Sequence, residues 1–141
     1  MPTSPGVGLL YAGLGCRRGT PASDLAGLLR QVLQDRDLPF SALAGLASID
    51  LKRDEPGLLQ LAEDLALPLH FYSAVQLAPF TPRLSHRSAT AFRHTGCYGV
   101  AESCALALAE QLGGATAQLR VERVVLGDMT LALAWAPASG G

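Results

Sequence analysis

With 141 residues, of which 49% are hydrophobic and 16% charged, the chain has the length and composition of one folded domain, residues 1–141, and not those of a disordered chain. The formal net charge of −1 and the pI of about 6.3 exclude nucleic-acid binding through a globally basic domain, so we expect no nucleic acid as a partner. No apolar run approaches the roughly 20 residues that a bilayer requires, and the first six residues lack the features of a signal peptide, so we expect a soluble, cytoplasmic protein with no membrane partner.

The N-terminal part of the chain predicts a strand, a glycine-rich loop and a helix. A short apolar run at residues 7–12 is typical of a buried strand, and glycines punctuate the loop at 13–19. Thr20 has the properties of a helix N-cap and Pro21 those of the first helical residue, so a helix is predicted to begin there. Its apolar residues recur at three- and four-residue spacing until residues 37–39 end it, which gives the helix one apolar face.

A second buried strand is predicted at residues 42–49. It is followed by residues 50–55, which carry both signs of charge. Asp54 can cap the next helix and Pro56 lies near its first position, and this helix is predicted to run to about residue 65.

A short strand at residues 69–72 and a brief helix precede a basic segment. Ser73 and Gln76 form a capping box, which predicts a helix that extends to residue 78. Residues 79–98 contain no acidic residue and are mostly polar, which predicts a long basic loop with a helical turn after Ser85. Such a loop is either solvated or a lid that closes over an anionic ligand. Its candidate residues for that contact are Arg83, Arg87, Arg93 and His94.

The C-terminal part of the chain completes an α/β pattern. Residues 100–112 predict a helix closed by two glycines, and residues 117–126 and 129–135 predict a hairpin. The order of elements predicts a three-layer α/β/α domain with a mostly parallel (mixed) sheet of about five strands and an antiparallel C-terminal edge strand. Ligands of such domains bind beyond the carboxyl ends of the strands. Because the segments 13–20 and 50–55 both follow strands, we expect them to meet in one crevice.

The loop at residues 13–20 favours a negatively charged small molecule. Its glycines expose backbone N–H groups, a helix N-terminus follows, and Arg17 and Arg18 flank it. The glycine spacing differs from the dinucleotide fingerprint and the loop lacks the lysine of a phosphate-binding P-loop, so we expect no cofactor. The alternative is a tight turn with solvated arginines. The residues expected to bind the ligand are Gly13, Gly15, Cys16, Arg17, Arg18, Gly19, Thr20, Lys52 and Arg53.

Three carboxylates are candidate general bases. Asp50 and Glu55 are expected to face the crevice, and the alternative for both is a solvated turn. Glu102 is predicted in the first turn of a helix, where it either complements the helix dipole or faces the crevice as a base.

The cysteines and histidines predict neither a disulfide framework nor a metal site. The three cysteines include no Cys-x-x-Cys pair, and the three histidines show no metal-ligand spacing. Cys16 precedes a helix N-terminus beside two arginines, which predicts a lowered pKa and leaves open a thiolate nucleophile or a small packing residue. Cys97 and Cys104 are expected to be buried small hydrophobic residues.

Three motifs, taken together, resemble the CobE family of cobalamin biosynthesis and the C-terminal domain of CbiG proteins. They are Gly-Leu-Gly-Cys-Arg-Arg-Gly-Thr at 13–20, Ser-Ile-Asp-Leu-Lys-Arg-Asp-Glu-Pro-Gly-Leu at 48–58 and Gly-Val-Ala-Glu-Ser at 99–103. Their order and spacing match over nearly the whole chain, which looks like the stand-alone CobE form because nothing in it corresponds to the N-terminal and middle regions of CbiG. The chain differs from CbiG-like proteins near its C-terminus, where they tend to carry a lysine and this sequence has Arg123.

The resemblance implies a role in building the corrin ring, where CbiG proteins open a lactone on a cobalt-precorrin intermediate and release acetaldehyde. Precorrins carry about seven or eight carboxylates around an apolar macrocycle, a ligand that suits a crevice rimmed by guanidinium and ammonium groups. The leading hypothesis is a protein that binds, carries or presents a precorrin or corrin intermediate. One alternative is a hydrolase or lyase that acts on a precorrin lactone, with Asp50, Glu55 or Glu102 as the base. Another is a structural partner that docks on a corrin-pathway enzyme through residues 80–98.

Overall fold

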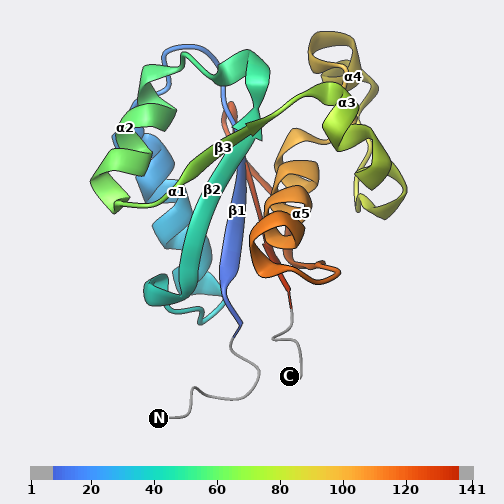
Figure 1. Cartoon of the computed structure of the whole chain (residues 1–141). Coiled ribbons are helices and arrows are strands. Elements are labelled where there is room, and N and C mark those ends of the chain that lie inside the picture. Colours follow the sequence, from blue (N-terminus) through green and yellow to red (C-terminus); the bar gives the residue numbers. More distant parts are fainter. Residues whose placement is uncertain (1–7, 137–141) are drawn as a thin grey trace.

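A five-stranded mixed sheet forms the centre of the computed structural model, which describes residues 8–136 (Figure 1). The strands lie in the order β3-β2-β1-β5-β4, in which β1, β2 and β3 are parallel and β5 runs antiparallel to both of its neighbours. Their bounds are β1 (Leu10–Gly15), β2 (Leu43–Ile49), β3 (Leu69–Tyr72), β4 (Gln118–Leu126) and β5 (Met129–Trp135).

The mixed α/β sheet confirms the fold class expected from the sequence, but the antiparallel strand is not at the edge. The tight turn at Gly127, where φ is +58°, folds β5 back beside β4 and places it next to β1. Leu131 to Ala134 are buried on both faces of the sheet, whereas β4 has several exposed side chains. The strand with both faces covered therefore occupies the interior, and β4 forms the edge.

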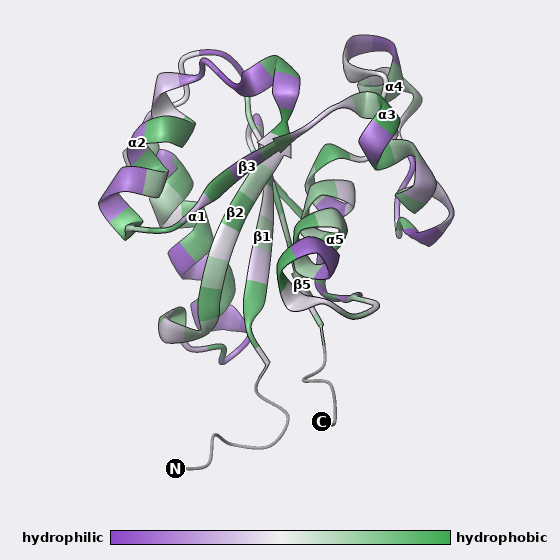
Figure 2. Ribbon diagram, viewed as in Figure 1, coloured by the Kyte–Doolittle hydropathy of each residue, from purple (hydrophilic) through white to green (hydrophobic). Residues whose placement is uncertain are grey.

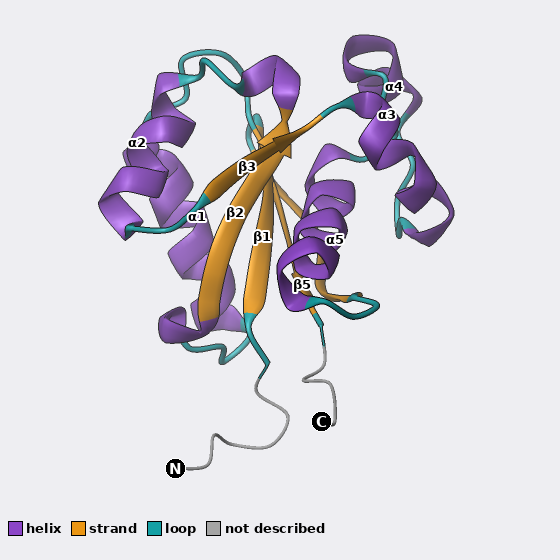
Figure 3. Ribbon diagram, viewed as in Figure 1, coloured by secondary structure: helices purple, strands orange, loops and turns teal. Residues whose placement is uncertain are grey.

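Helices cover both faces of the sheet (Figure 3). On one face lie α1 (Ala22–Asp35) and α2 (Pro56–Leu65), whose buried leucines pack against the strands while their outer faces are polar, as the alternation of green and purple in Figure 2 shows. On the other face lies α5 (Val100–Gly113), which is buried along most of its length. The short helices α3 (Ala74–Leu77) and α4 (Ala89–Thr95) lie on the α5 side, near the carboxyl ends of the parallel strands.

Strand β1 extends farther than predicted and approaches α5 closely. The predicted strand at 7–12 begins at residue 7, which lies outside the described residues, as do the first six residues; the observed strand runs to Gly15. Gly13 is thus a strand residue, and a Cβ atom there would overlap the carbonyl oxygen of Ala101 and lie 2.6 Å from the amide nitrogen of Ala105. The glycine therefore serves the packing of β1 against α5, which corrects its expected place in a ligand-binding loop.

Both predicted helix caps on the α1 and α2 side are shifted by one residue. Pro21, not Thr20, occupies the N-cap position of α1, and Glu55, not Asp54, occupies that of α2; neither helix has a side-chain cap hydrogen bond. The Thr20 hydroxyl instead donates to the carbonyl oxygen of Arg17 at 2.8 Å and closes the turn that precedes α1. The capping box of Ser73 and Gln76 is confirmed in α3.

The segment at residues 79–98 contains more helix than the predicted loop. A 3-10 helix, η3 (Ala78–Arg83), continues from α3, and α4 begins after Ser88, whose hydroxyl accepts from the amide of Ala91 at 3.0 Å. Gly96 ends α4 in the left-handed conformation, with φ of +79°. Within residues 8–136, no helix has the length and apolar character needed to cross a membrane.

Candidate functional site

A cavity of about 590 Å³ lies at the carboxyl ends of β1 and β2, and we call it the crevice. Gly15 lines it from the end of β1, Cys16 and Arg17 line it from the loop that follows, and Lys52 lines it from the 3-10 helix η2 (Asp50–Lys52) that follows β2. The buried hydroxyl of Ser48 donates to the carbonyl oxygen of Leu14 at 2.7 Å and ties the two strand ends together. The two turns meet in one place, as the parallel order of their strands led us to expect.

The opposite wall of the crevice comes from the second half of the chain. It is formed by α4, the first turn of α5 and the two strands of the hairpin. The side chains and backbone of these elements that line the cavity include those of Ser88, His94, Tyr98, Val100, Arg123 and Thr130. The crevice thus combines four separate segments of the sequence, and hydroxyl groups alternate in it with apolar surface.

Positive charge predominates in the crevice. Arg17, Lys52 and Arg123 line it, and Asp128 is the acidic side chain among its described lining residues. The Nε atom of Arg123 is buried and has no hydrogen-bond partner within residues 8–136. Arg123 is half-buried and lines the crevice, where a guanidinium can form charge-assisted hydrogen bonds with a ligand carboxylate.

The three carboxylates proposed as bases do not line the crevice, which corrects the expectation that they face it. Glu102 is 1% exposed, and its carboxylate accepts from the amide nitrogens of Ser85 and Arg123, each at 2.8 Å, and from the Ser85 hydroxyl. Glu55 is 6% exposed and accepts from the amide of Gly19 at 2.9 Å. Asp50 begins η2 and contributes nothing to the lining. Both buried acids accept hydrogen bonds from loop amides, because tertiary packing brings backbone donors to them.

The Cys16 thiol is buried in the crevice wall, and burial raises its pKa above the ordinary value. Lys52 lowers this pKa and Glu55 raises it, but burial is the largest cause. The lowered pKa predicted from the sequence is therefore wrong, and of the two interpretations left open the buried packing residue fits the structure. Cys97 and Cys104 are buried as predicted, and burial raises the pKa of Cys104 well above its ordinary value.

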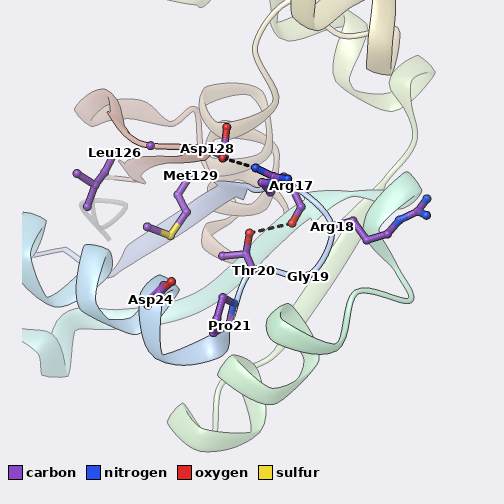
Figure 4. A pocket seen from close by; sticks show the side chains of 10 residues that line it. Arg17, Arg18, Gly19, Thr20, Pro21, Asp24, Leu126, Asp128 and Met129 are labelled. Atoms are coloured by element: carbon purple, nitrogen blue, oxygen red, sulfur yellow. Dashed lines mark hydrogen bonds and ion pairs between the residues drawn. The ribbon is translucent and has the colours of Figure 1, made fainter.

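A second cavity of about 530 Å³ adjoins the crevice at Arg17 and Asp128, which line both cavities (Figure 4). Arg18, Gly19 and Thr20, predicted with the crevice, line this second cavity. Figure 4 shows Arg17 directed at Asp128, whereas the Arg18 side chain points away from it. Arg53 is exposed and lines neither cavity.

Most of the basic side chains of residues 79–98 are engaged away from the crevice. Arg83 pairs with Glu110 at 3.0 Å, and Arg87 donates to the carbonyl oxygen of Thr81 at 3.2 Å. Arg93 donates to the hydroxyl of Thr90 at 3.3 Å, and His94 lines the crevice. The segment therefore contributes one wall of the crevice through α4. Among its four candidate residues, His94 is the one that lines the crevice.

The crevice positions of Arg123 and Ser48 were not predicted from the sequence. Arg123 lies on β4, and its position beside the first turn of α5 is set by tertiary packing, which no sequence signal indicates. Ser48 stands two residues before Asp50, near the carboxyl end of β2, where side chains reach a crevice. Within residues 8–136, no group of three or more histidines, cysteines or acids could hold a metal ion.

Comparisons with known proteins agree with this architecture. Residues 10–134 match the family model described as cobalamin synthesis G C-terminus. The fold resembles a crystal structure of CobE, a protein from the cobalamin (vitamin B12) biosynthetic pathway, with a TM-score of 0.86 and 48% identity, covering 94% of this chain and 93% of that one. It also resembles cobalamin biosynthesis protein chiG from Agrobacterium tumefaciens str. C58, with a TM-score of 0.69 and 30% identity over 91% and 98% of the two chains.

Two curated relatives point to the same pathway. Protein CobE from Sinorhizobium sp is 39% identical over 132 residues, which is 94% of this chain and 82% of that protein. A cobalt-precorrin-5A hydrolase from Priestia megaterium is 30% identical over 129 residues, and the matched region spans 33% of its length. Since the family model and a relative of similar length both cover almost all of the sequence, this chain is a cobalamin biosynthesis protein that belongs to the cobalamin synthesis G C-terminus family.

Proposed function

We propose that the crevice binds a polycarboxylate corrin or precorrin intermediate and that the protein carries this ligand or presents it to other enzymes of the pathway. The observation that carries the proposal is the convergence of Arg17, Lys52 and Arg123, from three separate segments, on one cavity that contains a single acid among its described lining residues. Cations held by a fold at one place, among apolar walls, suit a ligand whose carboxylates surround an apolar ring.

The arrangement favours binding over hydrolysis. The three carboxylates predicted as general bases, Asp50, Glu55 and Glu102, lie outside the crevice, and two of them are bonded to backbone amides. Cys16 has a raised pKa and is a poor nucleophile at neutral pH. The proposal therefore assigns the crevice to recognition, with the chemistry performed by a partner enzyme that receives the ligand.

Titration with hydrogenobyrinic acid, a polycarboxylate corrinoid, tests the proposal. We expect a change in its visible absorption and its co-elution with the protein on gel filtration. A Lys52→Gln/Arg123→Gln double variant should bind at least tenfold more weakly. The matched control is Arg30→Gln/Arg36→Gln, which removes two positive charges from the exposed face of α1 and its end.

Three outcomes would overturn the proposal. The first is the absence of both spectral change and co-elution with the wild-type protein. The second is equal loss of affinity in the two double variants, since this would reflect net charge and not the crevice. The third is conversion of a lactone-bearing precorrin by the protein alone, which would replace the carrier with a hydrolase.

A further inference from the structure

The ion pair of Arg17 and Asp128 stands between the crevice and the second cavity. Arg17 Nη1 lies 3.0 Å from Asp128 Oδ2, and both residues line both cavities (Figure 4). Their side chains are 73% and 61% exposed. An ion pair this exposed is held weakly, because water and salt screen it, so another carboxylate can take the place of Asp128 on the guanidinium.

The position of Asp128 supports a role as a counter-ion. It lies in the turn between β4 and β5, beside Gly127 in the left-handed conformation. The hairpin presents its carboxylate to the loop of β1, 111 residues away in the sequence. Asp128 is also the acidic side chain among the described residues that line the crevice. It weakens the binding of a carboxylate ligand in two ways, because it pairs with the Arg17 guanidinium and because its negative charge repels the ligand.

The second cavity has both charged and apolar walls. Leu126, Met129 and Pro21 give it an apolar wall, and Leu126 is 55% exposed although it is a large hydrophobic residue. Arg18 and Asp24 also line this cavity, and Lys52 and Arg123 line the crevice on the other side of the ion pair. An amphipathic ligand that spans both cavities would place carboxylates in the crevice and the edge of an apolar ring against Leu126 and Met129.

We propose that Asp128 is a displaceable counter-ion of Arg17, and that a ligand carboxylate replaces it on the guanidinium and thereby joins the two cavities into one binding groove. The proposal rests on the proposed function and deepens it by naming the residue that limits affinity. A carrier has to release its ligand, and a built-in competing carboxylate favours release because it re-forms the ion pair when the ligand leaves.

A double-mutant cycle with hydrogenobyrinic acid as the probe tests this role. Asp128→Asn keeps the shape of the side chain and removes its charge, and we expect binding three- to tenfold tighter than wild type. Arg17→Gln should weaken binding, and Asp128→Asn should give no gain when Arg17 is already Gln, because the competition acts through that guanidinium. Asp35→Asn, at the far end of α1, is the matched control for net charge and should leave affinity unchanged.

The outcomes separate this inference from the function on which it rests. If the wild-type protein binds the probe but Asp128→Asn binds equally or more weakly, the counter-ion role is wrong and the proposed function stands. The role is also wrong if the gain persists in the Arg17→Gln background or is matched by Asp35→Asn. If the wild-type protein does not bind the probe, the proposed function itself fails, and this role fails with it.

Discussion

The chain uses its buried acids and its crevice cations in opposite ways. Glu55 and Glu102 are buried, and their carboxylates accept hydrogen bonds from backbone amides and a hydroxyl. Arg17, Lys52 and Arg123 line the crevice. The formal charge of the whole chain is close to zero, so the positive character of the site comes from placement and not from composition.

The two groups of charges are also connected through the backbone. Glu55 holds the amide of Gly19, in the loop that carries Arg17, and Glu102 holds the amide of Arg123. Each buried acid therefore fixes the backbone of a segment that supplies a cation to the crevice. An acid near a cationic site can therefore serve to position it, and substitutions at the positioning acids should affect the fold whereas those at the crevice cations should affect binding.

The largest effect is expected from Glu102→Gln. The amide group cannot accept from all three of the donors that the carboxylate satisfies, so we expect a loss of about 3 kcal/mol in the free energy of unfolding, measured by urea denaturation. Glu122→Gln makes the same change at an exposed position of β4 and should alter stability by less than about 0.5 kcal/mol. Equal stability of the two variants would contradict the positioning role.

Glu55→Gln should cause a smaller loss. Its carboxylate accepts one backbone hydrogen bond, from Gly19, so the expected decrease in the free energy of unfolding is about 1–2 kcal/mol. Gly19 has a φ of +85°, and the released turn should become more accessible to proteases between Arg17 and Gly19. Limited trypsin digestion measures this, with Glu63→Gln on the exposed face of α2 as the control. Unchanged digestion would show that Glu55 does not hold the loop.

Lys52→Gln should act on ligand binding and not on the fold. We expect about tenfold weaker binding of hydrogenobyrinic acid and a free energy of unfolding within about 0.5 kcal/mol of wild type, because Lys52 lines the crevice without an ion pair within residues 8–136. The neighbouring change Arg53→Gln removes the same charge from an exposed position outside the crevice. The affinity of the Arg53→Gln variant for hydrogenobyrinic acid should differ from that of wild type by less than twofold. Similar losses in both variants would mean that net charge, and not the crevice, determines affinity.

The elements and the location of the crevice could be predicted because both depend on local patterns. Apolar spacing and capping residues marked the main helices and strands, and parallel strands bring their carboxyl ends to one edge, where Arg17 and Lys52 meet. Of α4, the sequence predicted only a helical turn after Ser85, although Ser88 and Gly96 mark the two ends of the helix, because its seven residues include few apolar positions. The sequence contains the N-cap serine and the C-cap glycine of this helix, but the polar composition of the segment favoured a loop.

The orientation of the acids could not be predicted from sequence. Glu102 is 17 residues from Ser85 and 21 from Arg123, so its partners are set by how η3, α5 and β4 pack. A carboxylate that will be buried against backbone amides has the same sequence signature as one exposed in a helix first turn. The raised pKa of Cys16 was missed for the same reason, since burial, its largest cause, is a property of the assembled fold.

The pKa of Cys16 responds in opposite directions to a positioning acid, Glu55, and to a crevice cation, Lys52, so the reactivity of its thiol compares the two. Burial raises the pKa of its thiol above the ordinary value, so its rate of alkylation by iodoacetamide should increase as the pH rises. Lys52 lowers this pKa and Glu55 raises it. At about pH 8, Lys52→Gln should therefore slow alkylation two- to threefold and Glu55→Gln should accelerate it, as mass spectrometry of Cys16 can measure. Loosening of the fold would accelerate the reaction in either variant, so slower alkylation in Lys52→Gln identifies the electrostatic effect, and faster alkylation there would contradict it.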